Sequence, residues 1–167
     1  YATLNEVVAV LNDPQQTSGE VTLLVPVGTH GDLNITNNQI TKLIINQTVP
    51  TGTASFANLG ITGLQEGVNV TLDTITVTGV ITIENISGLT LDASTAKFSA
   101  VSVNNLKNTT LDFSARSGAI NFVLDGDLTG TTISGGAGND TFALNNVLSD
   151  VTLDGKGGTN SLISNMS

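Results

Sequence analysis

The sequence predicts an all-β fold, a parallel β-solenoid (β-helix) of about 20 residues per coil with a short N-terminal capping helix. Three observations predict it. A motif of about 20 residues repeats along the chain, each repeat holds short apolar runs typical of strands, and a helical pattern occurs at the N-terminus. One such unit cannot bury its own apolar face, so successive units must stack as coils.

Three columns of apolar residues carry the repeat from Val70 onward, where VTLD recurs as LTLD, TTLD, TTIS and VTLD. The columns are Leu72, Leu91, Leu111, Ile133 and Leu153; Ile83, Val103, Val123, Leu144 and Ile163; and Ile86, Leu106, Leu128 and Leu148. Strand residues alternate between faces, so these columns are expected to point inward. The outward neighbours predict a threonine ladder of Thr71, Thr90, Thr110, Thr132 and Thr152. The step from Leu23 to Leu43 suggests that coils begin in the first third of the chain.

The helix is predicted over Thr3 to Leu11, TLNEVVAVL. Its apolar residues lie at helical spacing, and Thr3 with Glu6 fits a capping box. Such a helix, lying over the open end of the solenoid, would shield the core and the unpaired strand edge from water. A leucine-rich repeat horseshoe is the alternative fold, because its period is similar and LKNTTLDFS at Leu106 is close to its consensus. The helical side of that repeat and its regular Asn position are missing.

The composition restricts the partners. The chain has a net charge of −9 with 5 Lys and Arg against 14 Asp and Glu, so it cannot assemble a basic face for nucleic acid. Its apolar runs are too short for membrane insertion. The absence of cysteine excludes disulfides and thiolate metal sites. Because the chain begins at Tyr1 without an initiator Met, we interpret it as a segment of a longer protein.

A glycine-rich turn, GGAGNDTFA, occupies residues 135–143. Its glycines permit positive φ, which would let the turn direct its carbonyl oxygens at one point. Asp140 supplies the hard, anionic oxygen that Ca²⁺ prefers. Since Ca²⁺ takes about six to eight oxygen ligands, the next coil must contribute. There DGKGGTNSLI, residues 154–163, aligns Gly155 with Gly135 and Asn160 with Asp140.

The nonapeptide matches G-G-x-G-x-D-x-apolar-x at every defined position and resembles the calcium-binding RTX repeat of proteins exported by bacterial type I secretion. The resemblance implies a calcium ion held between the two turns. The predicted metal ligands are Gly135, Ala137, Asp140, Asp154, Gly155 and Asn160, with a weaker second site at Asp125 and Asp127. Lys156 and Asn160 depart from the family pattern and would weaken the site. The alternative is that the glycines only form a tight solenoid turn.

A second resemblance covers the N-terminal helix together with Glu20 to Asn46. The order of a helix, a strand, a V-P-x-G-T turn and two further strands is similar to the start of pectate-lyase-type parallel β-helices. We therefore expect a single solenoid domain over residues 1–167. It comprises a helical cap at 1–14, plain coils at 20–130 and RTX-like coils at 131–167.

Several other polar residues are expected to serve turns. Asp residues recur at strand ends, where they typically bond their own turns. These residues are Asp73, Asp92, Asp112 and Asp154, with Ser134 in the gap. The lone His30 is expected in a solvated turn, because no second histidine accompanies it.

For function, the sequence predicts a structural segment of a bacterial surface-layer or adhesin protein, secreted or at the cell surface, whose folding and assembly calcium stabilises. Its expected partners are calcium and copies of itself in a surface lattice, or cell-surface polysaccharide. A carbohydrate-active or carbohydrate-binding β-helix is one alternative, but catalysis is not expected, because the chain has no Trp, one Tyr and few basic residues. An ice-binding adhesin module is another, although Asp beside the Thr ladder suits ice poorly.

Overall fold

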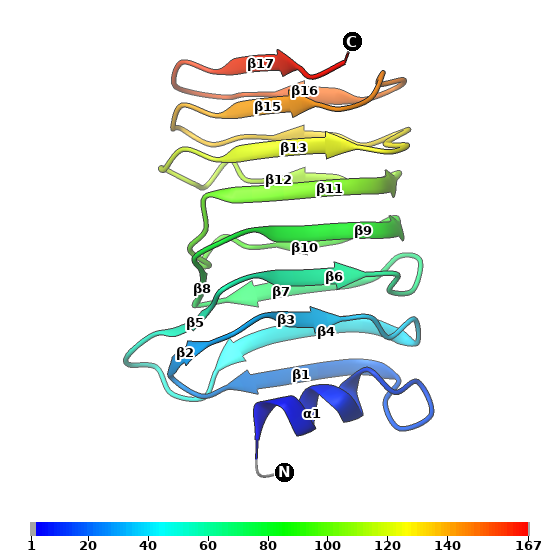
Figure 1. Ribbon diagram of the computed structural model, residues 1–167, viewed down its shortest axis with the longest axis vertical. Helices are drawn as coiled ribbons and strands as arrows, with labels where there is room; N and C mark the ends of the chain where they lie inside the picture. Colours follow the sequence, from blue (N-terminus) through cyan, green and yellow to red (C-terminus); the bar gives the residue numbers. More distant parts are fainter. Residues whose placement is uncertain (1–2, 167) are drawn as a thin grey trace.

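The computed structural model describes residues 3–166, which form a parallel β-solenoid of about seven turns (Figure 1). Each turn contains about 21 residues, and a single short helix, α1 (Leu4–Leu11), precedes the first. The predicted fold class is confirmed.

Three parallel sheets run along the solenoid. The first sheet contains β1 (Gly19–Val25), β4 (Ile40–Gln47), β7 (Asn69–Asp73), β10 (Thr90–Asp92), β12 (Thr110–Asp112), β14 (Thr132–Ser134) and β16 (Thr152–Asp154). The second sheet contains β3 (Leu33–Ile35), β6 (Leu59–Thr62), β9 (Ile81–Ser87), β11 (Ala100–Lys107), β13 (Asn121–Asp125), β15 (Thr141–Leu144) and β17 (Ser161–Ser164). A short third sheet contains β2 (Gly28–His30), β5 (Ala54–Phe56) and β8 (Ile75–Val77).

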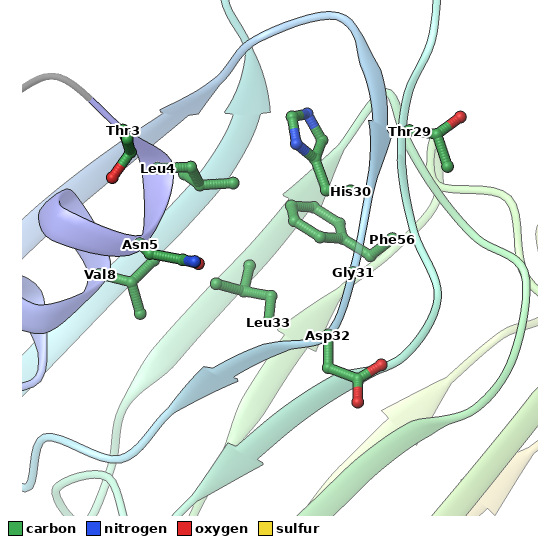
Figure 2. Close-up of a pocket in the computed structure, with 10 residues that line it drawn as sticks. All are labelled: Thr3, Leu4, Asn5, Val8, Thr29, His30, Gly31, Asp32, Leu33 and Phe56. Atoms are coloured by element: carbon green, nitrogen blue, oxygen red, sulfur yellow. The ribbon is translucent and has the colours of Figure 1, made fainter.

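Helix α1 closes the N-terminal end of the core, as predicted. The Thr3 hydroxyl accepts a hydrogen bond from the N–H of Glu6 at 3.2 Å. Leu11 is buried, and the other apolar residues of the stripe pack against the core. Figure 2 shows Leu4 and Val8 of the helix beside Leu33 of β3. The helix therefore occupies the place that a preceding coil would take.

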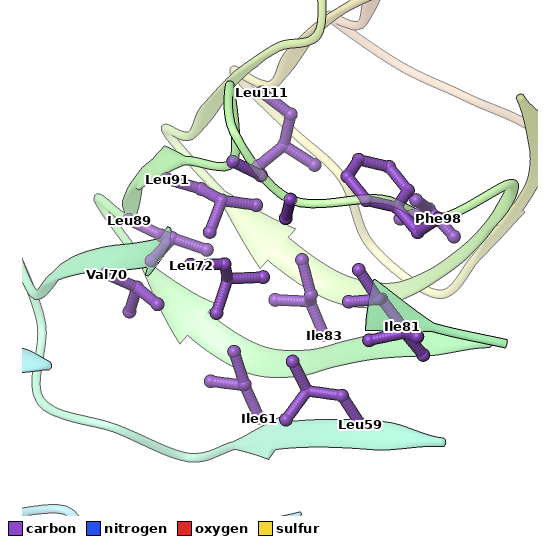
Figure 3. Packing of buried hydrophobic residues seen from close by; sticks show 14 of the residues in the cluster. Leu59, Ile61, Val70, Leu72, Ile81, Ile83, Leu89, Leu91, Phe98 and Leu111 are labelled. Atoms are coloured by element: carbon purple, nitrogen blue, oxygen red, sulfur yellow. The ribbon is translucent and has the colours of Figure 1, made fainter. Parts of the chain in front are cut away.

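The core is a stack of inward-pointing apolar side chains from the facing sheets (Figure 3). Ile83 of β9 and Leu72 of β7 are both 0% exposed, and burying each such side chain contributes about 1.5–3 kcal/mol. Beyond the end of the short third sheet, phenylalanine rings fill the interior. Successive ring centroids lie 5.5, 5.6 and 4.7 Å apart along Phe98, Phe113, Phe122 and Phe142.

The first predicted column is correct from Leu91 onward and wrong before it. Leu91, Leu111, Ile133 and Leu153 pair in sequence, and Thr90, Thr110, Thr132 and Thr152 form the outward ladder beside them. However, Val70 rather than Leu72 pairs with Leu91, and Thr71 pairs with Asp92. Similarly, Leu23 pairs with Ile45 rather than Leu43. A shift of two residues keeps every side chain on its face, so the apolar pattern cannot detect it.

The second predicted column is wrong at Val123 and at Ile163, which pairs with Ala143 rather than Leu144. The step from Ile83 to Val103 is confirmed, but Val103 then pairs with Leu124. Val123 faces outward and is 37% exposed, whereas Leu124 is fully buried. One additional residue in the turn before β13 is enough to exchange the two faces.

This register predicts opposite outcomes for two neighbouring substitutions. Leu124→Ala should lower the free energy of unfolding by about 2–5 kcal/mol, because it leaves a cavity in the core. Val123→Ala should cost less than about 1 kcal/mol, because its side chain lies on the outward face. Urea denaturation of both variants measures the difference, and a larger loss at Val123 would contradict the register.

Candidate functional site

The glycine-rich turn connects β14 to β15, and a buried carboxylate lies at its centre. The Asp140 side chain is 0% exposed. Its Oδ1 accepts the N–H of Ile120 at 2.9 Å, and its Oδ2 accepts the N–H of Gly136 at 2.9 Å. Ile120 belongs to the preceding coil, so the carboxylate connects two coils as well as closing its own turn.

The glycines of this turn are required by close approach of other atoms. A Cβ on Gly135 would clash with the Asp140 carboxylate, and one on Gly136 would clash with the carbonyl oxygen of Arg116. A Cβ on Gly138 would lie 2.6 Å from the backbone N of Ala119. The predicted reason, positive φ, is wrong, because none of these three glycines has it.

The second glycine turn repeats the first one coil later. Asn160 Oδ1 accepts the N–H of Asp140 at 2.8 Å, and Asn160 Nδ2 donates to the carbonyl of Gly157 at 3.0 Å. Asp140 and Asn160, which we call the Asx column, thus each cap the backbone N–H that lies 20 residues earlier. Here Lys156 and Gly158 do have positive φ, at 56° and 75°.

Asp154 lies apart from this column, on the outward face of β16. Its Oδ1 accepts the N–H of Lys156, and its Oδ2 pairs with Lys156 Nζ at 2.9 Å. The hydrogen bond from the Lys156 side chain is the main cause that lowers the pKa of Asp154, and Asp154 in turn raises the pKa of Lys156. Asp154, which was predicted to complete the calcium site, therefore has its carboxylate paired with a lysine.

The predicted ligands divide into two groups. Gly135 and Asp140 lie together in the first turn, and Gly155 and Asn160 lie together one coil later. In the first turn, a carboxylate oxygen of Asp140 occupies the space that a Cβ on Gly135 would fill. Ala137 donates its N–H to the carbonyl of Arg116 at 2.8 Å. Within residues 3–166, no three His, Cys, Asp or Glu side chains gather as a metal site would require. A calcium site shared by both turns does not fit the second turn, because Asp154 there is paired with Lys156.

The two aspartates of the weaker predicted pair bond different groups. Asp125 Oδ1 accepts the N–H of Gly126 at 2.8 Å. Asp127 accepts hydrogen bonds from the hydroxyl and N–H of Thr129, and it pairs with Lys107 at 3.0 Å. The Thr129 hydrogen bonds, followed by that from Lys107, lower the pKa of Asp127 to about 2.

The strand-end Asp residues bond their own turns, as predicted. Asp92 Oδ1 accepts the N–H of Ser94 at 3.0 Å, and Asp112 Oδ1 accepts the N–H of Ser114 at 2.9 Å. These hydrogen bonds lower the pKa of both carboxyl groups. Asp73 is the exception, because it pairs with Asn46 in the ladder and accepts the Thr95 hydroxyl at 2.8 Å.

Asparagine side chains provide further coil-to-coil bonds that the sequence reasoning missed. Asn105 Nδ2 donates to Asn85 Oδ1 at 3.2 Å, and both residues have positive φ. Asn165 Nδ2 donates to Asn145 Oδ1 at 2.8 Å. Asn139 Oδ1 accepts the N–H of Thr159 at 2.8 Å. The signal that could have identified the first two pairs is their spacing of 20 residues.

Arg116 was also missed. Its guanidinium lies over the Phe98 ring, 4.3 Å from the centroid, and donates to the carbonyl oxygens of Phe98 and Ala96. Nε is buried without a hydrogen-bond partner, and burial lowers the pKa of Arg116. The sequence signal that could have identified Arg116 is the presence of an arginine in a chain with few charged residues. It ties two successive coils together where the third sheet is absent.

A cavity of about 460 Å³ lies between α1 and the first coils (Figure 2). Thr3 and Asn5 line it from the helix, and His30, Asp32 and Phe56 line it from the coils. His30 was expected in a solvated turn, but it ends strand β2. Its Nε2 lies 2.7 Å from the carbonyl of Pro26, and its ring lies 5.5 Å from that of Phe56. These contacts account for His30 as a packing residue.

No helix among the described residues has the length and apolar character needed to cross a membrane. No protein-family model matches the chain, and comparisons with curated proteins and solved structures also gave no match. The RTX and pectate-lyase-type resemblances therefore stay predictions, whereas the solenoid architecture is directly observed.

The close approach at the glycine turn predicts a sharp contrast between two glycines. Gly136→Ala should lower the free energy of unfolding by about 1–3 kcal/mol, because the new methyl group meets fixed backbone. Gly118→Ala, in the turn of the preceding coil, should change it by less than about 0.5 kcal/mol, because nothing lies within 4 Å of a Cβ there. Denaturant unfolding compares them, and equal losses would refute the explanation.

The lowered pKa of Asp127 predicts an effect of acid. Its contribution to stability is complete above the ordinary pKa of 3.8 and is lost as the pH falls toward about 2. Carboxyl NMR titration should give a midpoint near about 2 for Asp127. Thr129→Val and Lys107→Met should each raise this midpoint, since each removes a side-chain hydrogen bond to the carboxylate. A midpoint unchanged by both substitutions would contradict this cause.

Proposed function

We propose that this chain is a structural segment of a bacterial surface-layer or adhesin protein, acting outside the cell as a rigid β-solenoid. One observation carries the proposal. Several polar side chains of the turns form bonds between coils, so they serve the stack itself. Asp140, Asn105 and Asn165 each bond the coil before them.

The surface supports the same role. Residues that face outward from the strands are mainly Thr, Asn, Ser and Asp, and the strand-end carboxylates are satisfied by neighbouring N–H and hydroxyl groups. Low charge, absence of cysteine and the RTX-like motif favour a secreted or cell-surface location. A lattice of copies of the chain and cell-surface polysaccharide are the proposed partners.

Calcium binding stays a prediction of the motif, now centred on the first glycine turn. Among the described residues, Asp140 has a wholly buried acidic side chain, and two backbone N–H groups donate hydrogen bonds to its carboxylate. The second turn does not offer the predicted ligands in its present arrangement. Calcium therefore is not required to explain why the turn contains glycine and Asp.

The structural role is tested by assembly and by sugar binding. Electron microscopy and light scattering of the purified chain should show ordered self-association in millimolar Ca²⁺, the range of extracellular calcium modules. Calorimetric titration with acidic and neutral polysaccharides measures sugar binding. Incubation with the same polysaccharides should release no shortened oligosaccharides. Release of shortened oligosaccharides would instead support the carbohydrate-active alternative.

Calcium is tested separately by thermal melting with Ca²⁺ and with chelator. If the ion binds at the first turn, Ca²⁺ should raise the Tm of the natural chain by several degrees, following mass action. Asp140→Asn should abolish that increase, while Asp154→Asn, which changes an exposed carboxylate paired with Lys156, should preserve it. An identical Tm in Ca²⁺ and chelator, with no heat in a calorimetric titration, would eliminate the calcium prediction.

A further inference from the structure

A groove follows the corner between the first and third sheets. It consists of three hollows of about 320, 230 and 280 Å³. The first two hollows share Gln47, Pro50 and Thr74, and the last two share Thr95 and Lys97, so the groove is continuous. Its lining residues come from successive coils, and three inter-strand steps of about 4.8 Å give it a length of about 14 Å. That length suits a short stretch of an extended polymer.

The wall of the groove contains a row of hydrogen-bonded polar side chains. The Thr74 hydroxyl donates to Asn46 Oδ1 at 2.8 Å, and the Thr74 N–H donates to the Thr95 hydroxyl at 3.2 Å. The Thr95 hydroxyl in turn donates to Asp73 Oδ1 at 2.8 Å. These bonds cross three coils and hold the polar groups in place. Hydroxyl, amide and carboxylate groups in such a row can exchange hydrogen bonds with the hydroxyl groups of a sugar chain.

Two of the five Lys and Arg residues of the chain lie together at one end of the groove. Lys97 and Arg116 both line the third hollow, whose described lining residues include no Asp or Glu. The Arg116 guanidinium donates to the carbonyl of Ala96, another lining residue, so its charge lies at the wall of the hollow. Among residues 3–166, neither Lys97 nor Arg116 forms an ion pair. This end of the groove therefore carries positive charge that the described residues do not neutralise.

The fold directs Lys97 outward where the third sheet ends. Its N–H donates to the carbonyl of Ile75 at 2.9 Å, and its carbonyl accepts the N–H of Val77 at 2.8 Å. Lys97 thus pairs with Thr76 on the outward face, while the neighbouring Phe98 is buried. Because the net charge of the chain is −9, two unpaired cations in one hollow are a local exception, and they favour an anionic ligand group.

The opposite end of the groove is acidic. Asp73 lines the first hollow, together with Asn46 and Gln47. A sugar carboxylate would be repelled by Asp73, whereas the hydroxyl groups of a neutral sugar can donate to it. The groove therefore suits a ligand that carries a negative charge at one end and hydroxyl groups at the other.

We propose that this groove binds a polysaccharide in which acidic sugars alternate with neutral ones. Lys97 and Arg116 bind one sugar carboxylate, and Asp73 and the threonine hydroxyls bind the neighbouring neutral sugar. The inference rests on the cell-surface polysaccharide that is the proposed partner of the chain, and it adds the charge pattern of that partner and its place of binding.

Calorimetric titration with a hyaluronan hexasaccharide, in chelator and at low salt, tests the cationic end. The natural chain should bind it at least about fivefold more tightly than its carboxyl-reduced form, in which alcohols replace the carboxylates. Lys97→Met should remove this preference, while Lys42→Met, which changes a lysine outside the groove, should preserve it. Both lysines are exposed, so both variants should keep the Tm of the natural chain. Equal losses in the two variants, or no binding by the natural chain, would overturn the proposal.

An alginate hexasaccharide, which is acidic at every sugar, tests the charge pattern. It should bind the natural chain more weakly than the hyaluronan hexasaccharide does. Asp73→Asn should reduce that difference, because the amide still accepts the Thr95 hydroxyl but no longer repels a carboxylate. Alginate or polyglutamate that binds the natural chain as tightly as hyaluronan would overturn the proposal.

These titrations are independent of lattice assembly, because they use short oligosaccharides in chelator. Self-association in Ca²⁺ without binding of the hexasaccharide would overturn this inference and leave the structural role standing. Binding of the hexasaccharide without self-association would support the inference and remove the lattice from the proposed function.

Discussion

Parallel backbone pairing between consecutive coils is the interaction on which the rest of the structure depends. Many strands are short, and all four first-sheet strands after β7 contain only three residues, such as Thr110–Asp112. Such a strand is stable only because neighbours on both sides complete its hydrogen bonds and stack its apolar side chains. The interior columns follow from this pairing, since every coil places its inward residues over those of the coil before it.

The turns need a second kind of interaction, because backbone pairing between strands leaves some of their N–H groups without an acceptor. Buried N–H groups in a turn are costly unless they find an acceptor. Asp140 and Asn160 provide it from the following coil, while Asn85 and Asn105 link coils at another corner. Bringing the coils close enough for these bonds leaves no room for side chains at positions such as Gly136. Glycine and Asx residues therefore occur together for one geometric reason.

The side-chain bonds join coils in both directions. Asp140 accepts the N–H of Ile120 in the preceding coil, whereas Asn139 accepts the N–H of Thr159 in the following coil. At the N-terminal end, α1 covers the apolar residues of the first coil without pairing as a strand, because a helix satisfies its own backbone.

The sequence by itself determined the solenoid, the capping helix and the strand-end Asx turns, because these depend on residue spacing within one coil or one turn. It identified the glycine turn and Asp140 but assigned the glycines the wrong cause. Tertiary structure alone decided the register between Val70 and Leu91, the burial of Leu124 in place of Val123, and the contacts of Arg116. Those features depend on how many residues each turn absorbs and on which atoms of the adjacent coil come close. The alternation of apolar and polar residues contains neither quantity.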